Sequence, residues 1–330
     1  MVKEDPILED GEEVLISVLR PQTLKEYVGQ TKVKDSLNVF IKAARLRKEP
    51  MEHILIYGPP GLGKTTLANI LAKETDSQIK ISSGPAIERA GDLVSILTNL
   101  EDSDILFIDE IHRLNKVVEE VLYTAMEDYA VDVVIGKGPS AKSLRVDLPR
   151  FTLIGATTRI SLISSPMRDR FGIVHSLDFY SDEELEQIVQ RSSGILNIKV
   201  DKSSVGEIAK RSRKTPRIAN RLLKRVRDFA TVYNNGDVNR DLTVDSLERI
   251  GIDEKGLDEI DRKVLKTIIS HFDGGPVGLD TLAAATAIEK STIEEVVEPF
   301  LMQIGYLKRT PKGRMATDAA YAHLGTKNKT

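Results

Sequence analysis

The stretch "HILIYGPPGLGKTTLANILA", His53 to Ala72, contains the pattern that decides the fold. His53–Tyr57 is a short apolar run typical of a buried strand, Gly58–Lys64 is a glycine-rich loop, and a helical pattern follows from Thr65. The G-x4-G-K-T spacing of the loop matches a phosphate-binding loop in the strand–loop–helix context that this motif requires. The stretch therefore predicts a nucleotide site on a parallel α/β sheet.

The residue types of the loop suit the chemistry of a bound triphosphate. Glycines such as Gly61 and Gly63 let backbone N–H groups approach phosphate oxygens, and the helix N-terminus adds positive potential. Lys64 is expected to reach the β- and γ-phosphates, and the Thr65 hydroxyl is expected to ligate Mg²⁺. The alternative is a chance glycine-rich turn, which the flanking strand and helix patterns disfavour. ATP and Mg²⁺ are therefore the expected ligands.

A second motif, "DILFIDEIHR" from Asp104 to Arg113, ends an apolar strand pattern in two carboxylates. At the carboxyl end of a central parallel strand, Asp109 can hold the Mg²⁺ shell, and Glu110 can orient and polarise the attacking water. Acidic residues also favour the first turn of a helix, so a capped helix start is the alternative. The phosphate-binding loop upstream favours the catalytic interpretation.

Further polar groups follow apolar patterns downstream. "FTLIGATTR" ends near Thr158, whose hydroxyl could bind the γ-phosphate or the water, although threonine is also a common strand residue. "SSPMRDRFG" carries Arg168 and Arg170, either of which could stabilise transition-state charge across a subunit boundary. An ion pair with Asp169 or another carboxylate is the structural alternative for each arginine.

The segment "KTPRIANRLLKRVRDFA" predicts a helix after the α/β core. Thr215 is a suitable N-cap and Pro216 a suitable first helical residue. Arg217 then lies in the first turn of this helix, so its side chain is expected to contact the group that lies at the N-terminal end of the helix.

The C-terminal part has the pattern of a separate small domain. A charged, glycine-interrupted hinge is expected near Asp253–Leu257. Helices are predicted over residues 261–271, 279–285 and 291–304, followed by a hairpin. Three helices and a basic hairpin are typical of a winged helix.

The hairpin carries the candidate DNA-binding residues Lys308, Arg309, Lys312 and Arg314, with Arg309 and Arg314 as the main candidates for phosphate contact. The alternatives are a solvated basic hairpin or a protein-binding module.

The composition narrows the functional classes. A chain of 330 residues predicts two or three domains, and 41% hydrophobic with 29% charged residues is typical of a globular protein. The formal net charge of −3 gives no overall signal for nucleic acid, but six Lys or Arg stand against one Asp from Leu301 onward. The absence of cysteine excludes disulfides and thiolate metal sites and suits the cytoplasm. No membrane segment is expected, because no apolar run approaches the roughly 18 residues that a span needs.

The ribbon pattern "VDVVIGKGPSAKSLRVDLP", Val131 to Pro149, lies between the carboxylate and threonine strands. It predicts two short strands around a Gly/Pro/Ser turn, each with apolar residues at alternate positions. The apolar residues in question are Val131, Val133, Ile135, Leu144, Val146 and Leu148. Since the nucleotide motifs would form a core without it, the ribbon is either structural or a contact surface.

The order of these motifs resembles that of the AAA+ ATPases. The strings "LRPQTLKEYVGQ", "LFIDEIHRLN", "GATTR", "RDRFGIV", "TPRIANRLLKRVRD" and "GGPVGL" narrow the resemblance to the RuvB-like family of Holliday-junction branch-migration motors. The likeness runs from about Leu19 to about Thr317.

The resemblance implies an α/β fold with an AAA+ P-loop parallel-sheet core, a helical lid and a C-terminal winged helix. The expected domains are residues 1–181 with a hairpin insertion at 131–148, residues 182–254, and residues 255–330. It also implies an ATP-hydrolysing motor on duplex DNA and Holliday junctions that forms a homo-oligomeric, hexameric ring. RuvA would dock on the hairpin, where the candidate contact residues are Val131, Val133, Ile135, Leu144 and Val146. RuvC would join the larger complex, and the protein would be cytoplasmic and free of the membrane.

The resemblance also assigns nucleotide contacts beyond the phosphate-binding loop. Arg170 would be the finger that reaches the neighbouring subunit's site, and Arg217 would be the lid sensor. The remaining contacts it implies are Leu19, Arg20, Thr66, Glu127, Asp128, Tyr129 and Tyr180. One position departs from the family, which usually has glycine before the Thr-Pro-Arg triplet, where this chain has Lys214.

Two alternatives to the motor function remain. An ATP-gated DNA-binding switch of the initiator or loader kind would carry the same nucleotide motifs and winged helix without moving along DNA. A protein-remodelling ATPase is the more distant alternative. For the hairpin, packing against the core is the alternative to docking a partner.

Overall fold

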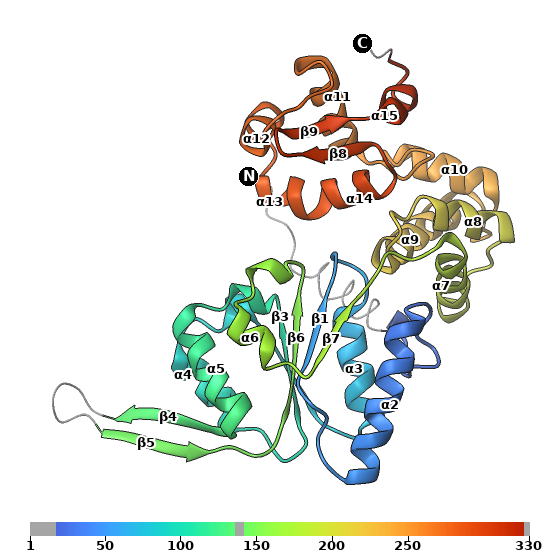
Figure 1. Cartoon of the computed structure of the whole chain (residues 1–330). Coiled ribbons are helices and arrows are strands. Elements are labelled where there is room, and N and C mark those ends of the chain that lie inside the picture. The colour runs from blue at the N-terminus through green and yellow to red at the C-terminus, as the bar shows by residue number, and fades with distance from the viewer. Residues whose placement is uncertain (1–17, 136–141, 327–330) are drawn as a thin grey trace. The chain divides into compact units, whose positions relative to one another are not determined.

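A parallel sheet organises the N-terminal half of the chain (Figure 1). The structure, a computed structural model, describes residues 18–135 and 142–326. Within these residues, five strands pair in the order β2-β3-β6-β1-β7, and all of them are parallel. Their bounds are β1 Ile54–Tyr57, β2 Ile79–Ser83, β3 Ile105–Asp109, β6 Thr152–Thr157 and β7 Ile173–Ser176.

The central strands are buried, as their uninterrupted apolar runs predict. Every residue of β6 is buried, as are Ile105–Ile108 of β3. In Figure 1, α4 and α5 cover one face of the sheet, and α2 and α3 cover the other. The helices of this half are α2 Thr31–Arg47, α3 Lys64–Glu74, α4 Ala90–Thr98, α5 Lys116–Asp128 and α6 Ser165–Asp169, with 3₁₀ turns at Gly84–Ala86, Ile111–Arg113 and Ile160–Leu162.

The chain divides into two compact units. The first, here called the core unit, comprises Arg20–Gly58 and Gly63–Asp178. The second, here called the lid–head unit, comprises Leu19, Pro59–Leu62 and the chain from Phe179 onward. The tip of the phosphate-binding loop therefore groups with the C-terminal half of the chain.

The predicted ribbon forms in the core unit from β4 (Ala130–Ile135) and β5 (Lys142–Asp147), and it projects from the sheet in Figure 1. The strands are antiparallel, with Val131 opposite Val146 and Val133 opposite Leu144. Val131 is fully buried in the core, whereas Leu144 is 52% exposed.

This placement corrects one expectation about the ribbon. Val131 was a candidate for partner contact, but it is a core residue because the base of the ribbon packs beside α5. Val133 and Val146 are partly buried against the same cluster. The side chain of Ile135 and the turn at residues 136–141 lie outside the described residues. The packing alternative therefore holds for the base of the ribbon, and docking stays a prediction for its distal part.

The lid–head unit begins with a helical lid. Its helices are α7 Asp182–Ile195, α8 Lys202–Lys210, α9 Pro216–Tyr233 and α10 Arg240–Arg249. The helix predicted at Pro216 begins there, with Thr215 as the preceding residue, and its Leu222 and Val226 side chains are buried. In the described part of the chain, no helix combines the length and apolar character needed to cross a membrane.

The winged helix follows and confirms the predicted architecture. Its elements are α11 Glu259–His271, α12 Leu279–Thr286, α13 Lys290–Thr292, α14 Glu298–Gln303, β8 Leu307–Thr310, β9 Gly313–Ala316 and α15 Asp318–His323. A π-helical turn, Ile293–Val297, joins α13 to α14, so the single helix predicted over 291–304 is interrupted. β8 and β9 form the antiparallel wing.

The wing corrects the expectation for Arg314. Arg314 and Arg309 are opposite each other in the hairpin register, so their side chains share one face of the wing. That face meets the helix formed by α13 and α14, where Glu294 and Glu298 are one turn apart. Arg314 is only 7% exposed and makes a bidentate ion pair with Glu298, whereas Arg309 is exposed and 3.8 Å from Glu294. The Arg314 guanidinium therefore binds inside the domain.

Arg314→Ala should destabilise the head strongly, because it leaves the buried carboxylate of Glu298 without its cation. Breaking such a pair from one side costs about 3–5 kcal/mol. Arg309→Ala, the matched control in the exposed position, should stay within about 0.5 kcal/mol. Hydrogen exchange of residues 307–316 in the full chain measures both effects. Equal protection in the two variants would contradict the structural role of Arg314.

Candidate active site

The phosphate-binding loop leaves the carboxyl end of β1 and leads into α3. Gly58 and Gly63 have backbone φ angles of 147° and 99°, in a region that favours glycine. A Cβ on Gly58 would lie 2.6 Å from the Leu177 carbonyl oxygen, and a Cβ on Gly63 would lie 2.8 Å from the Tyr27 hydroxyl. The loop is thus a close-packed backbone cradle, which explains the glycines of the motif.

Lys64 is the first residue of α3 and is buried, with 7% of its surface exposed. Its Nζ donates a hydrogen bond to the Gly58 carbonyl oxygen at 2.8 Å. An ammonium group held inside the loop, at a helix N-terminus, supplies positive charge where phosphates would bind. Thr65 and Thr66 follow in the first turn and are half-buried. These residues fit a triphosphate together with the hydroxyl ligand that Mg²⁺ takes beside it.

Two neighbouring strands, β3 and β6, place the predicted catalytic residues together. Asp109 is the last residue of β3, and its Oδ1 accepts a hydrogen bond from the Glu110 N–H at 3.0 Å. Oε2 of Glu110 accepts hydrogen bonds from the Thr158 hydroxyl at 3.1 Å and from the Thr158 N–H at 3.3 Å. Glu110 itself has φ 46° and ψ 47°, an uncommon backbone that persists only where neighbouring contacts fix it. The turn therefore holds the Glu110 carboxylate on Thr158.

His112 belongs to the same cluster and was missed by the sequence analysis. Its Nδ1 lies 3.2 Å from Oε2 of Glu110 and 2.9 Å from Oγ1 of Thr157, and its side chain is buried. The ring thus restrains the carboxylate from a second side. The one indication in the sequence was the position of His112 two residues after Glu110. A tight turn there folds the ring back toward the end of β3.

The lid–head unit gathers a second group of predicted residues around the loop tip. The carbonyl oxygen of Gly61 accepts a hydrogen bond from the Arg217 N–H at 3.4 Å. The Tyr180 hydroxyl donates to the Leu62 carbonyl oxygen at 3.2 Å, and Tyr180 is buried. A Cβ on Gly61 would lie 3.2 Å from the Cβ of Arg217, so the first turn of α9 lies directly against the loop tip.

Two predicted residues stand at the start of the described chain. Leu19 is buried, and its carbonyl oxygen accepts a hydrogen bond from Nη1 of Arg191 on α7 at 2.8 Å. Leu19 is therefore fixed to the lid by its backbone. Arg20, the first residue of the core unit, is half-buried.

The predicted arginine finger lies at the opposite edge of the sheet from the phosphate-binding loop. Nη2 of Arg170 pairs with Oε2 of Glu127 at 2.9 Å, and its guanidinium carbon lies 4.8 Å from the centroid of the Tyr123 ring. Glu127 follows Met126, whose carbonyl oxygen lies 3.1 Å from Nε2 of His53. His53 directly precedes β1, whereas the loop follows the carboxyl end of β1. Arg170 and Glu127 therefore lie at the amino edge of the sheet.

Asp128 and Tyr129 lie at the same amino edge. Oδ2 of Asp128 pairs with Nη2 of Arg145 at 2.9 Å, and the Tyr129 ring lies 6.1 Å from the His53 ring. Burial raises the pKa of the Tyr129 hydroxyl. The structure does not bring Glu127, Asp128 or Tyr129 to the phosphate-binding loop of their own chain, because α5 runs back along the sheet after β3. It places all three at the amino edge instead, with Glu127 paired to Arg170.

The environment of Arg170 restrains its guanidinium. The Tyr123 hydroxyl donates to Oε1 of Glu119, and burial followed by this hydrogen bond raises the pKa of Tyr123. Nη1 of Arg170 donates to the Pro166 carbonyl oxygen at 2.8 Å. Arg168, the other candidate, is exposed at the end of α6. The Tyr123 ring and the hydrogen bonds to Glu127 and Pro166 thus hold the guanidinium of Arg170 in place, whereas Arg168 is exposed.

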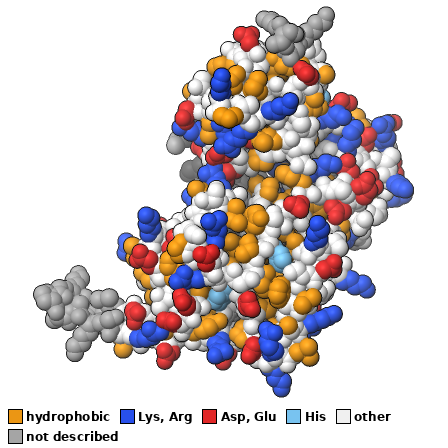
Figure 2. Space-filling model, viewed as in Figure 1, with side chains coloured by type: hydrophobic (Ala, Val, Ile, Leu, Met, Phe, Trp, Pro, Cys, Tyr) orange, Lys and Arg blue, Asp and Glu red, His pale blue; other side chains and the backbone are white. Residues whose placement is uncertain are grey.

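The basic wing residues separate into exposed and buried groups. Lys308, Arg309 and Lys312 are exposed, whereas Arg314 is buried. Figure 2 shows Lys and Arg interspersed with Asp and Glu over the face in view, which agrees with the small net charge of the chain. The exposed basic residues of the wing therefore stay the candidates for phosphate contact.

Three family models match consecutive parts of the chain. They are the Holliday junction DNA helicase RuvB P-loop domain over residues 19–177, the RuvB AAA lid domain over 180–253, and the RuvB C-terminal winged-helix domain over 254–325. Together they span the core, the lid and the winged helix described above.

Individual relatives agree with these models. The chain is 60% identical over 311 residues to the Holliday junction branch migration complex subunit RuvB of Clostridium kluyveri, which covers 94% of this chain and 89% of that protein. Among solved structures, the Thermotoga maritima RuvB Holliday junction branch migration motor matches with a TM-score of 0.87 and 49% identity, over 94% of this chain and 99% of that one. A mutant of the same Thermotoga protein matches with a TM-score of 0.88 and 50% identity, over the same shares of the two chains.

Proposed function

The chain belongs to the RuvB family, and from this membership and the site geometry we propose how its own residues drive branch migration. It is a Holliday junction branch migration motor, and its AAA+ core hydrolyses ATP. We propose that identical subunits form a ring, a hexamer in the family pattern, that moves duplex DNA by repeated hydrolysis. The observation that carries the proposal is the location of Arg170 at the opposite sheet edge from Lys64 and Glu110.

Hydrolysis would proceed by in-line attack of a water on the γ-phosphorus. Glu110 would orient that water, since its carboxylate is held at the carboxyl end of β3. Lys64 would bind the β- and γ-phosphates, and Thr158 would contact the γ-phosphate or the water. Mg²⁺, held by Thr65 and Asp109, would neutralise phosphate charge when bound.

Other residues would bind the rest of the nucleotide. Leu19 and Arg20 would flank the adenine, Tyr180 would contact the nucleotide, and Gly61, Gly63 and Thr66 would contact phosphates. Arg217 would sense the γ-phosphate, which its position in the first turn of α9 against Gly61 supports.

A neighbouring subunit would complete the site. Arg170 would stabilise transition-state charge in the next subunit's site, with Glu127, Asp128 and Tyr129 in the same interface. The proposal is supported by the shared location of all four residues at the amino edge of the sheet. An active site assembled from two subunits requires an oligomer.

The partners follow from family membership. The exposed Lys308, Arg309 and Lys312 of the wing would contact DNA phosphates without reading sequence. RuvA would dock on the distal part of the β4–β5 ribbon, where Leu144 is exposed. We expect RuvC in the larger complex and a cytoplasmic location, which the absence of cysteine suits.

Branch migration should depend on hydrolysis. With RuvA, the protein should convert a synthetic four-way junction to duplex products with ATP but not with a non-hydrolysable analogue. Glu110→Gln should still bind ATP but hydrolyse it at least about 100-fold more slowly, since a positioned acid–base group contributes at least this factor. Gel electrophoresis of labelled junctions and phosphate release measure the two effects. Equal conversion with the analogue would favour the ATP-gated DNA-binding switch.

Complementation between two inactive variants should reveal the shared site. Arg170→Ala keeps an intact phosphate-binding loop, and Lys64→Ala keeps an intact finger. Each should hydrolyse ATP poorly alone, and an equimolar mixture should recover part of the wild-type rate, because a Lys64→Ala subunit lends Arg170 to its neighbour. Phosphate release from the mixture checks this, with oligomer size measured by light scattering. No recovery in mixed oligomers would mean that Arg170 does not act between subunits.

Two variants of the β4–β5 ribbon should distinguish its proposed role in docking RuvA from its role in packing against the core. Leu144→Asp changes an exposed residue, so basal ATP hydrolysis should stay near the wild-type rate while stimulation by RuvA is lost. Val131→Asp changes a fully buried residue on the same ribbon and should lower the unfolding temperature of the core instead. Full RuvA stimulation of the Leu144→Asp variant would exclude that surface as the dock.

A further inference from the structure

The loop between α8 and α9 contains two consecutive residues in a backbone conformation that side chains rarely adopt. Arg213 and Lys214 have φ angles of 54° and 58°. Neither is glycine, so the conformation persists only where surrounding contacts fix it. The contacts of these two residues therefore show what holds the loop.

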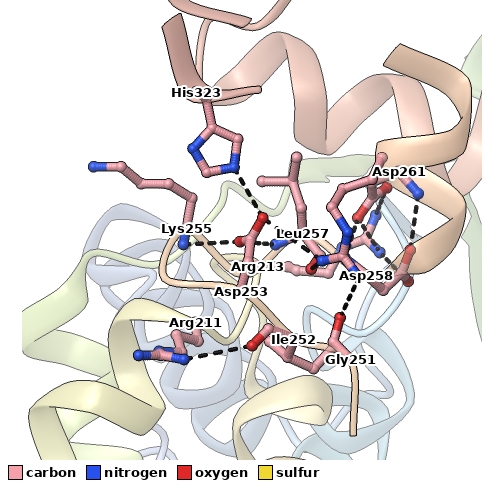
Figure 3. A network of polar contacts seen from close by, with 11 residues as sticks. Arg211, Arg213, Gly251, Ile252, Asp253, Lys255, Leu257, Asp258, Asp261 and His323 are labelled. Atoms are coloured by element: carbon pink, nitrogen blue, oxygen red, sulfur yellow. Dashed lines mark hydrogen bonds and ion pairs between the residues drawn. The ribbon is translucent and has the colours of Figure 1, made fainter. Parts of the chain in front are cut away.

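The side chain of Arg213 leaves the lid and binds inside the winged helix (Figure 3). Nη1 lies 3.0 Å from Oδ2 of Asp258 and 3.1 Å from Oδ2 of Asp261, and Nη2 lies 3.1 Å from Oδ1 of Asp261. Nη2 also donates to the Val296 carbonyl oxygen at 2.9 Å, and the guanidinium carbon lies 4.6 Å from the centroid of the Phe300 ring. One side chain thus joins the start of α11 to the helix that packs on the wing.

Burial makes this joint specific for arginine. Asp261 is fully buried, and Arg213 is 8% exposed. Burial raises the pKa of Asp261 to about 7, and Arg213 is the cation that opposes this rise. A planar guanidinium can pair with a carboxylate, reach a carbonyl and stack on a ring at the same time, which an ammonium group cannot. Val296 lies in the π-helical turn, a kind of helix defect often found at functional positions.

The other end of the loop lies against the tip of the phosphate-binding loop. The carbonyl oxygen of Lys214 accepts from the Tyr180 N–H at 3.1 Å, and its Nζ pairs with Oδ1 of Asp182 at 2.6 Å. Three residues later, the Arg217 N–H donates to the Gly61 carbonyl oxygen. Five consecutive residues therefore run from the buried joint in the head to the loop that holds the nucleotide.

The linker beside this joint is also held firmly. In the segment where a hinge was expected, residues 253–257, Oδ1 of Asp253 accepts hydrogen bonds from the N–H groups of Lys255 and Leu257, both at 2.9 Å. Its Oδ2 lies 2.9 Å from Nε2 of His323 on α15 (Figure 3). The linker and Arg213 thus give the head two separate attachments to the lid.

We propose that Arg213 is a positioning residue that transmits the nucleotide-dependent position of the 213–217 turn to the winged helix. The proposal rests on the motor function, because it assigns the step between hydrolysis and DNA movement. Arg213 touches neither nucleotide nor DNA in this role. It makes the head follow the lid when the turn against the loop tip moves.

Arg213→Lys tests the proposal, since it keeps the charge and removes the paired and stacked contacts. Basal ATP hydrolysis should stay within about twofold of wild type, while junction conversion should fall roughly tenfold, within the usual range of coupling between sites. Arg211→Lys is the matched control. Arg211 lies two residues earlier and is also buried, but it binds Glu207 and the Ile252 carbonyl oxygen instead of the head. This control should convert junctions at close to the wild-type rate.

Hydrogen exchange distinguishes coupling from simple stability. In wild type, a non-hydrolysable ATP analogue should change exchange in both residues 213–233 and residues 258–271. In Arg213→Lys, the change should remain in the first segment and disappear from the second, whatever the unfolding temperature of the variant. An unchanged response in residues 258–271 would overturn the proposal.

A milder variant covers the case in which Arg213→Lys folds poorly. Asp258→Asn keeps an N-cap acceptor for α11, because asparagine and aspartate cap equally well, but it removes one charge facing Arg213. It should give a smaller loss of junction conversion, with normal basal hydrolysis. If wild type itself fails to convert junctions, the motor function fails. If wild type converts them and both variants match it, only the role of Arg213 fails.

Discussion

The direction of the parallel strands is the constraint on which the rest of the structure depends. Because the strands are parallel, their carboxyl ends meet at one edge, and the phosphate-binding loop, Glu110 and Thr158 all follow strand ends there. Each helix returns the chain to the other edge, so Arg170 and Glu127 come together far from their own loop. In the proposed mechanism, an arginine at that edge serves a site on another chain. The direction of the strands would then be the reason why the proposed motor has to assemble into a ring.

The adjacency of β3 and β6 has a further chemical consequence. The Thr158 hydroxyl carries one proton, so it can donate either to the Glu110 carboxylate or to a phosphate oxygen, but not to both at once. In the structure it donates to Glu110, and His112 restrains the same carboxylate. A γ-phosphate that takes the Thr158 hydrogen bond would leave Glu110 with one fewer restraint. The ends of β3 and β6 would therefore link the occupancy of the nucleotide site to the mobility of Glu110, the residue proposed to orient the water.

The sequence predicted the features that depend on local chemistry. Lys64 and Glu110 could be found because a phosphate-binding loop and a carboxylate strand end need fixed residue types at fixed spacing. The buried role of Arg314 could not be found, because a basic residue in a hairpin looks the same whether it meets solvent or a buried glutamate. Val131 was misjudged for a similar reason, since alternation shows that a ribbon has an apolar face but not how much of that face the core covers. His112 was missed because its position two residues after Glu110 is informative only once the direction of the turn is known.

The loop at Lys214 shows how a local substitution can be absorbed without changing the path of the chain. Its φ of 58° is a conformation that glycine reaches easily, which accounts for the glycine usual at this place in the family pattern. The same backbone conformation costs a lysine about 1 kcal/mol or more. The partly exposed ion pair with Asp182 offsets a part of this cost. The hydrogen bond from the Tyr180 N–H to the backbone of residue 214 is independent of the side chain there. The turn therefore keeps its direction, and Arg213 keeps its place in the winged helix. The added ion pair also fixes the turn to α7, so in this chain the segment that joins the nucleotide loop to the head is tied to the lid by a side chain as well as by its backbone.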